Sequence, residues 1–172
     1  MGTKTNTRHP IPQLRRGTEA KSNDPYGSRK GSKDPAKCGI CQSVYHRKRW
    51  YTKEDRLDLD VSEKTMTITV CPTCRKTREN YPQGVVTLRG EFLAENKDEI
   101  LHLIRNEEER TKRINPVARI ISVKDTDDGI EIQTTSERFA ERLGKEVKKA
   151  FKGELHFHWS KGDKLVRVEW VR

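Results

Sequence analysis

Four cysteines in two C-x-x-C pairs are the residues of this chain best suited to chemistry. Cys38 and Cys41 form the first pair, and Cys71 and Cys74 form the second. A C-x-x-C turn directs two thiolates at one ion, and two such turns complete the tetrahedral set that zinc takes in closed structural sites. The spacing therefore predicts one bound Zn²⁺ ion, held by all four cysteines.

Other uses of cysteine pairs fit the sequence less well. A redox C-x-x-C needs a thiol of low pKa at a helix start within a thioredoxin-like βαβ unit, and neither pair has that context. A zinc deaminase needs H-x-E ahead of P-C-x-x-C, whereas His46 is followed by Arg47 and Lys48. Four thiolates also leave no open coordination position, which favours a structural metal. Redox, iron–sulfur and catalytic metal sites stay as alternatives.

The stretch after the first pair, YHRKRWY at residues 45–51, combines cations with aromatic rings. Cations neutralise phosphates, and aromatic faces stack on unpaired bases, a combination used for RNA loops and single strands. The alternative is that Tyr45 and Trp50 form the core of a small domain, and we expect at least one of them to do so. The predicted nucleic-acid contacts here and after the second pair are His46, Arg47, Lys48, Arg49, Trp50, Tyr51, Arg75, Lys76 and Arg78.

The charge of the chain also favours a polyanionic partner. Its 172 residues include 36 Lys and Arg against 26 Asp and Glu, a formal net charge of +10. Nucleic acid is favoured over a membrane, because no apolar run approaches the ~20 residues of a spanning helix. With no apolar segment of the secretory type near the amino terminus, we expect a reduced, cytoplasmic protein.

Residues 1–36 are expected to form a disordered basic arm. Residues 1–37 contain nine Lys or Arg, three acidic residues and few aliphatic side chains, so they cannot bury enough surface to offset the entropy of ordering. Such an arm either follows phosphates or serves only as a solubilising tail. Its predicted RNA contacts are Arg8, Arg15, Arg16, Arg29, Lys30 and Lys33.

The strands and helices expected around these residues together make an α+β fold. Residues 37–90 are expected to form a zinc ribbon, with strands at 43–51 and 66–70 and a long polar insert between them. The insert explains a separation of the cysteine pairs greater than the ~15–20 residues common in ribbons. Residues 91–116 are predicted to form a helical connector, since Ile100, Leu103 and Ile104 share one helical face.

Residues 117–172 are predicted to form a ββαββ domain with a four-stranded sheet and one covering helix. Asp128-Gly129 is a favoured pair for a hairpin turn between two alternating strands. Ser136 then caps a helix with a continuous apolar stripe, and two further alternating strands end the chain.

Two other groups of possible metal ligands have a simpler interpretation. Glu99 and His102 form a single E-x-x-H, which marks a di-metal site only in paired copies. His156 and His158 share one strand face but have no third ligand. We interpret both as solvent-exposed polar surface.

The sequence resembles two families. ISVKDTDDGIEIQTTSERFAERLGKEVKKAF resembles the hairpin-then-helix segment of the large-subunit nuclear export adaptor (the nonsense-mediated decay export protein) of eukaryotes and archaea, which also carries C-x-x-C zinc modules. Residues 38–172, including CPTCRKTRENYPQGVVTLRGEFL, resemble small bacterial zinc-ribbon proteins related to that adaptor, mostly without an assigned function. The chain has two C-x-x-C pairs rather than a longer series and lacks the adaptor's later domains, so nuclear export is not implied.

The resemblance and the charge together lead us to expect a non-catalytic, zinc-binding RNA-binding protein. It would bind ribosomal RNA and ribosomal proteins, with the large subunit favoured, in assembly, quality control or hibernation. A DNA-binding zinc-ribbon regulator is the alternative. A nucleic-acid-processing enzyme is disfavoured, because the sequence has no phosphate-binding glycine loop, no G-x-S-x-G and no acidic cluster for catalytic magnesium.

Overall fold

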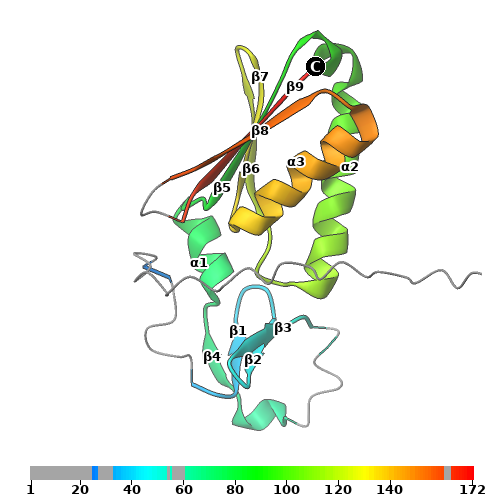
Figure 1. Ribbon diagram of the computed structural model, residues 1–172. Helices are drawn as coiled ribbons and strands as arrows, with labels where there is room; N and C mark the ends of the chain where they lie inside the picture. The colour runs from blue at the N-terminus through cyan, green and yellow to red at the C-terminus, as the bar shows by residue number, and fades with distance from the viewer. Residues whose placement is uncertain (1–24, 27–32, 54, 56–60, 161–163) are drawn as a thin grey trace, which may run out of the picture.

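The computed structural model describes residues 25–26, 33–53, 55, 61–160 and 164–172. These residues form two β-sheets, with four and five strands, and three α-helices (Figure 1). The predicted α+β class is confirmed at this level. The predicted RNA contacts Arg8, Arg15, Arg16, Arg29 and Lys30 lie outside the described residues. None of the helices in the described part of the chain has the length and apolar character needed to cross a membrane.

The four-stranded sheet carries the first cysteine, Cys38, at the end of its strand β1. Its strands are β1 (Ala36–Cys38), β2 (Val44–His46), β3 (Arg49–Tyr51) and β4 (Thr67–Thr69), in the order β3-β2-β1-β4. A 3-10 turn, η2 (Glu63–Thr65), precedes β4. With helix α1 (Pro72–Arg78), these elements form what we call the cysteine module, residues 33–53 and 61–78.

Two features of this module differ from the sequence prediction. The predicted strand 43–51 is a hairpin, because Arg47 and Lys48 take φ angles of 48° and 63° and reverse the chain. The predicted disordered arm also ends too late: Ala36 is fully buried and pairs with Tyr45 and Thr67. The cysteine module therefore begins a few residues before the first cysteine.

The five-stranded sheet contains β5 (Gly84–Arg89), β6 (Ile120–Thr126), β7 (Gly129–Thr134), β8 (Glu154–Trp159) and β9 (Val166–Val171). The strand order is β6-β7-β5-β9-β8. β5 pairs antiparallel with β7 and parallel with β9. The expected hairpins β6–β7 and β8–β9 are both present and antiparallel.

The predicted four-stranded ββαββ layout is wrong because β5 lies in the middle of this sheet. The predicted zinc ribbon, residues 37–90, includes residues 84–89. Val86 and Leu88 are fully buried and stand opposite apolar residues on both neighbouring strands, namely Ile132 and Ile130 of β7 and Val168 and Trp170 of β9. These pairings fill the centre of the core, so residues 84–89 belong with the carboxyl-terminal sheet.

Two helices, rather than one, cover this sheet. α2 (Glu91–Ile114) and α3 (Glu137–Phe151) lie beside each other on the same side of it (Figure 1). Leu93, Ile100 and Ile104 of α2 are buried in the same apolar core as the sheet residues. An ion pair joins the helices, with Arg142 Nε 3.2 Å from Glu107 Oε2. Residues 91–116 are therefore part of this domain as well as a connection.

Close contacts define how α3 crosses the sheet. A Cβ added to Gly84 on β5 would lie 2.4 Å from Cβ of Ala140, in the first half of the helix. A Cβ added to Gly144 would lie 2.5 Å from Val168 and 3.0 Å from Leu155, on β9 and β8. α3 thus starts over the middle of the sheet and reaches the start of the edge strand β8.

The central place of β5 predicts the cost of truncating one of its side chains. Leu88→Ala should lower the free energy of unfolding by about 2–5 kcal/mol, because it leaves a cavity in a closed core. Val171→Ala, on the neighbouring strand but exposed, should change it by less than about 0.5 kcal/mol. Urea unfolding of the full chain measures both. Equal effects of the two variants would contradict the central position of β5.

Candidate metal centre

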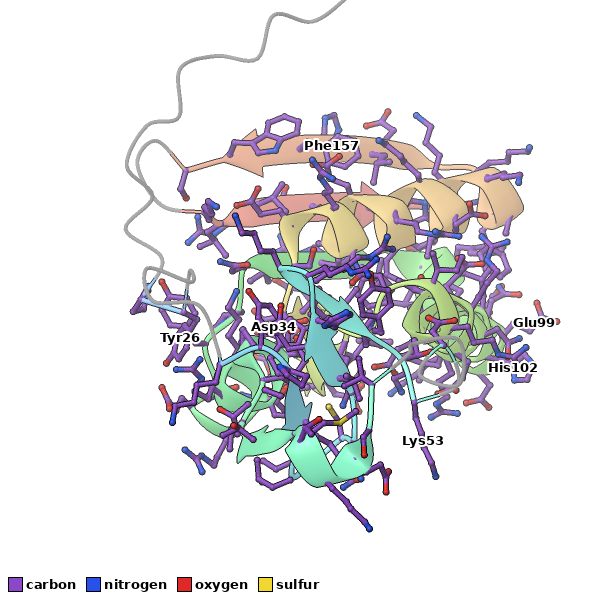
Figure 2. The ribbon with its side chains drawn as sticks, turned by 90° about the horizontal axis from the view of Figure 1, so that it is seen from below. Tyr26, Asp34, Lys53, Glu99, His102 and Phe157 are labelled. Carbon is purple, nitrogen blue, oxygen red and sulfur yellow. The ribbon has the colours of Figure 1, made fainter. Side chains whose placement is uncertain are left out.

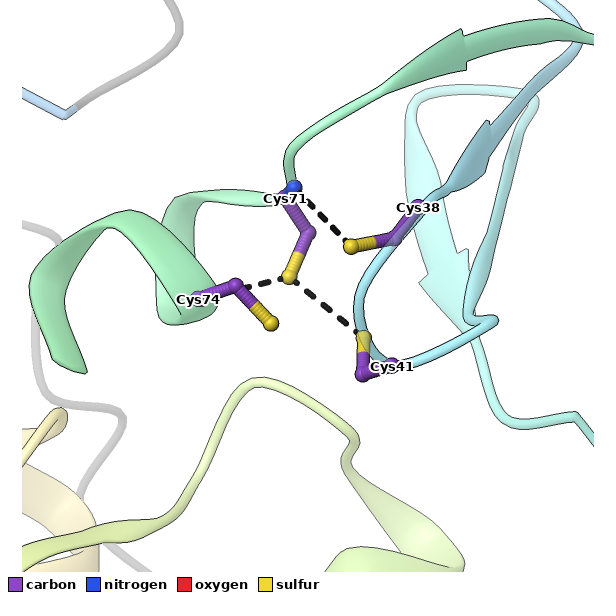
Figure 3. A group of neighbouring side chains, drawn as sticks. All are labelled: Cys38, Cys41, Cys71 and Cys74. Atoms are coloured by element: carbon purple, nitrogen blue, oxygen red, sulfur yellow. Dashed lines mark hydrogen bonds between the residues drawn. The ribbon is translucent and has the colours of Figure 1, made fainter. Parts of the chain in front are cut away.

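The four predicted ligands come together in one cluster. The Sγ atoms of Cys38, Cys41, Cys71 and Cys74 all lie within 4.8 Å of one another (Figure 3). Cys41 Sγ and Cys71 Sγ are 3.7 Å apart. A regular tetrahedron with metal–sulfur bonds of ~2.3 Å has edges of ~3.8 Å. The cluster therefore has the size and donor set to hold one metal ion.

The first pair sits on the turn that ends β1. The Cys38 amide donates to Ser43 O at 2.8 Å, and the Gln42 amide donates to Cys38 O at 3.0 Å. Gln42 takes a positive φ of 64°, which closes the turn. Cys41 Sγ lies 3.2 Å from Ser43 Oγ. The turn thus holds both sulfurs on its inner side.

The second pair is placed by a strand pairing and a helix start. β4 runs parallel to β1, with Thr69 opposite Cys38, so the chain reaches Cys71 close to the first pair. Cys71 caps α1, Pro72 occupies the first turn, and the Cys74 amide donates to Cys71 Sγ at 3.3 Å. The Cys71 amide donates to Cys38 Sγ at 3.4 Å (Figure 3). Such N–H donors stabilise sulfur in its thiolate form.

The protonation of the sulfurs is strongly uneven. The hydrogen bond with Cys71 lowers the pKa of Cys41 to about 3, and the same contact raises the pKa of Cys71. Burial raises the pKa of Cys74 to about 12. Four neighbouring thiolates in a buried site repel one another, so full ionisation requires a cation among them. Metal binding here therefore displaces protons.

The cluster is also a large part of the core of the cysteine module. Cys38, Cys71 and Cys74 are buried, and Trp50 and Val70 pack against them. The rest of the buried apolar set in this module is small: Ala36, Val44, Tyr45 and Met66. In modules with so little apolar surface, the free energy of metal binding contributes directly to folding.

The hairpin next to the cluster presents three consecutive cations. Arg47, Lys48 and Arg49, which we call the basic tip, are all exposed. The Arg49 guanidinium carbon lies 5.6 Å from the centre of the Tyr51 ring. The rings of Tyr45 and Trp50 have centres 5.3 Å apart and planes inclined by 49°, with Tyr45 buried and Trp50 half-buried. Both aromatic residues thus contribute to the core of the module.

Asp34 supports the basic tip and was not among the predicted site residues. Its Oδ2 accepts from the Arg47 amide at 2.9 Å, and its Oδ1 lies 2.8 Å from Nδ1 of His46. The hydrogen bond with His46 lowers the pKa of Asp34 below its ordinary value. Asp34 lies beside the small sheet in Figure 2. A single aspartate in a basic, Gly- and Ser-rich segment gave no signal of this contact.

The remaining predicted contacts are not equally accessible. Lys33 and Arg78 are exposed, and Arg75 is half-buried. Lys76 is only 8% exposed, because it lies on the inner face of α1. The cations on α1 therefore form no continuous exposed row, in contrast to the basic tip.

The two histidine patterns occupy surface positions. Glu99 and His102 are exposed on α2, where Figure 2 shows them at the rim of the molecule. His156 and His158 are exposed on β8, and His156 Nε2 lies 3.6 Å from Glu154 Oε2. Among the described residues, the four cysteines are the one group of three or more His, Cys, Asp or Glu close enough to share a metal ion.

Comparisons with family models, with curated proteins and with solved structures found no match for this chain.

Loss of one ligand should release the metal and unfold the module. We expect Cys71→Ser to lose most of its metal on dialysis, as measured by elemental analysis. Amide signals of the cysteine module should collapse, while those of β5 to β9 stay dispersed because that sheet has its own core. Ser43→Ala, which changes a neighbour of Cys41 but no ligand, is the control and should keep its metal. Full metal content in Cys71→Ser would contradict the four-cysteine site.

Removal of the Asp34 carboxylate should loosen the basic tip. In Asp34→Ala, the Arg47 amide loses its acceptor, and its hydrogen exchange measured by NMR should speed up by at least about tenfold. Asp98→Ala, an exposed aspartate on α2, is the charge-matched control. Since the pKa of Asp34 is lowered from 3.8, its contribution is complete above that value and is lost as the pH falls through the lowered one. Unchanged exchange at Arg47 would show that Asp34 does not hold the turn.

Proposed function

We propose that this chain is a non-catalytic zinc protein that binds ribosomal RNA, with the large ribosomal subunit as the favoured docking site. The observation that carries the proposal is the basic tip: three exposed cations on a short hairpin whose inner side packs on the cysteine cluster. A rigid display of charge binds phosphates without the entropy cost of ordering a free loop.

Zinc is the metal we assign to the cluster. Four thiolates in a closed tetrahedral arrangement suit Zn²⁺ better than the harder ions that prefer oxygen ligands. With four protein ligands the ion has no open position for water or substrate. Its role is then to fold the cysteine module and orient the basic tip, which is why we propose a binding protein rather than an enzyme.

RNA is favoured over duplex DNA by the form of the basic surface. The tip is a compact hairpin flanked by the partly exposed rings of Trp50 and Tyr51, which suits phosphates and unpaired bases of folded RNA. Duplex DNA is commonly recognised by a helix that places several side chains in the major groove. The cation-bearing α1 has only seven residues and buries Lys76.

The ribosomal location rests on the resemblance of the cysteine pairs and of residues 119–151 to the large-subunit export adaptor. Under this proposal, the cytoplasmic chain acts in subunit assembly, quality control or hibernation. Ribosomal RNA contacts the basic tip, and ribosomal proteins contact the charged surfaces of the five-stranded domain.

Neutralisation of the basic tip gives a quantitative test of the proposal. Arg47→Ala, Lys48→Ala and Arg49→Ala combined should remove co-sedimentation of the tagged protein with ribosomal particles in a native lysate. With purified ribosomal RNA, the negative slope of log affinity against log salt should become shallower by about 2 in the same variant, since each lost phosphate contact accounts for about 0.7–0.9 of that slope. The matched control, Arg105→Ala, Lys124→Ala and Lys148→Ala, removes three exposed cations elsewhere and should leave the affinity for purified ribosomal RNA and its salt dependence unchanged.

The outcomes separate the alternatives. Absence of the wild-type chain from every ribosomal fraction at both low and physiological salt would defeat the ribosomal proposal. Tighter binding to duplex DNA than to structured RNA would instead favour a DNA-binding regulator. Equal losses in the two triple variants would mean that net charge, and not the basic tip, determines binding.

A further inference from the structure

One of the four cysteine ligands is partly open to solvent. Cys41 is half-buried and lies on the turn that ends β1, beside the exposed residue Ile40. The other three ligands are shielded, with exposed fractions of 0%, 1% and 6% for Cys38, Cys71 and Cys74. A small reagent in solution therefore meets Cys41 before it meets the other three cysteines.

An open pocket also borders the cluster. It has a volume of about 480 Å³, and its lining includes Ile40 and Cys74 of the cysteine module together with Lys112 on α2 and Ile120 on β6. Water and small polar solutes can enter a pocket of this size. The boundary between the cysteine module and the five-stranded domain thus leaves the cluster accessible to small molecules.

The accessible cysteine has a buried cysteine within reach. Cys41 Sγ and Cys71 Sγ are 3.7 Å apart, a contact drawn as a dashed line in Figure 3. The two sulfurs need to approach by only about 2 Å to reach the length of a disulfide bond. Cys41 belongs to a surface turn, and surface turns move more easily than the strands and helices that they connect. The geometry is therefore suited to a disulfide that joins the two C-x-x-C pairs.

The cluster also supports the basic tip. Trp50 packs against the cysteines and directly follows Arg49 in the chain. The Trp50 ring in turn lies 5.3 Å from the Tyr45 ring between their centres. Because the apolar core of this module is small, loss of the metal would remove much of the support of the hairpin. A chemical change at the cluster would thus reach the charges that we assign to RNA binding.

We propose that the cluster is a peroxide-sensitive switch, in which oxidation of Cys41 and Cys71 to a disulfide releases the zinc ion and loosens the basic tip. The switch rests on the proposed function, because it regulates the RNA contact made by that tip.

The oxidant in this step is hydrogen peroxide. The Cys41 thiolate attacks one peroxide oxygen, the O–O bond breaks, hydroxide leaves and Cys41 becomes a sulfenic acid. The Cys71 thiolate then attacks the Cys41 sulfur, the S–S bond forms and a second hydroxide leaves. The two thiolates lose two electrons in total, which the peroxide gains, and each hydroxide takes a proton from solvent. The two remaining thiolates are too few for a closed zinc site, and a thiol reductant reverses the change by disulfide exchange.

The test follows zinc and disulfides in the full, zinc-loaded chain. Hydrogen peroxide is added in the presence of a coloured zinc chelator, and unreduced proteolytic peptides are mapped by mass spectrometry. We expect one zinc ion to be released for each Cys41–Cys71 disulfide that forms, and zinc binding to recover after addition of a thiol reductant and Zn²⁺. Retention of zinc, or release of zinc without a Cys41–Cys71 disulfide, would overturn the switch.

Cys41→His separates the reactivity of this sulfur from its role as a ligand. Histidine can complete a Cys₃His zinc site but cannot form the disulfide, so zinc release by peroxide should slow by at least about tenfold. Ser43→Ala changes a side chain 3.2 Å from Cys41 Sγ and keeps all four cysteines, so this matched control should stay sensitive to peroxide. Equal release rates from Cys41→His and the wild type would overturn the role of Cys41. If Cys41→His binds no zinc, the peptide map of the wild type decides.

RNA binding is measured separately. The oxidised wild type should bind purified ribosomal RNA at least about tenfold more weakly than the reduced, zinc-loaded form, since three long side chains lose their fixed support. Unchanged RNA affinity after complete oxidation would overturn the link between the cluster and the basic tip. Failure of the reduced wild type to bind this RNA would overturn the proposed function, while the peptide map would still decide whether the redox step occurs.

Discussion

The pairing of β5 between β7 and β9 is the constraint on which the arrangement of this protein depends. α1 starts at the second cysteine pair and leads after a short turn into β5, the middle strand of the large sheet. Thr73 Oγ1 on α1 also donates to Val117 O at 3.1 Å, just before β6. The cysteine cluster is thus joined to the larger core by covalent and hydrogen-bonded links. Figure 1 shows α1 between the two sheets.

The parts of the fold that the sequence predicts are those encoded by local spacing. Two C-x-x-C pairs identify the cluster, Asp128-Gly129 identifies the β6–β7 hairpin, and the stripe on α3 identifies its buried face. The sequence does not predict the central place of β5, because the alternation of Val86 and Leu88 fits an edge strand and a central strand equally well. Its partners on β7 and β9 are distant in sequence, and only the assembled sheet determines that order.

The sequence likewise predicts some features of the candidate site and not others. Exposure of the basic tip could be expected, since Arg and Lys rarely occupy a core. Burial of Lys76 could not, because it depends on how α1 packs between the cysteine cluster and the larger domain. Asp34 contacts His46 and the Arg47 amide across a tertiary interface, which residue types in the chain do not reveal.

The backbone of the hairpin supports a role for its charge independently of any resemblance. Arg47 and Lys48 both take positive φ angles, a conformation that costs a residue with a Cβ roughly 1–2 kcal/mol and that Asn-Gly adopts far more easily. Placing two like charges side by side there adds repulsion. The Asp34 carboxylate offsets part of this cost by accepting the Arg47 amide. Under the proposed function, phosphates bound to the basic tip would offset the strain and the repulsion of a turn that carries cations where glycine and asparagine would be more stable.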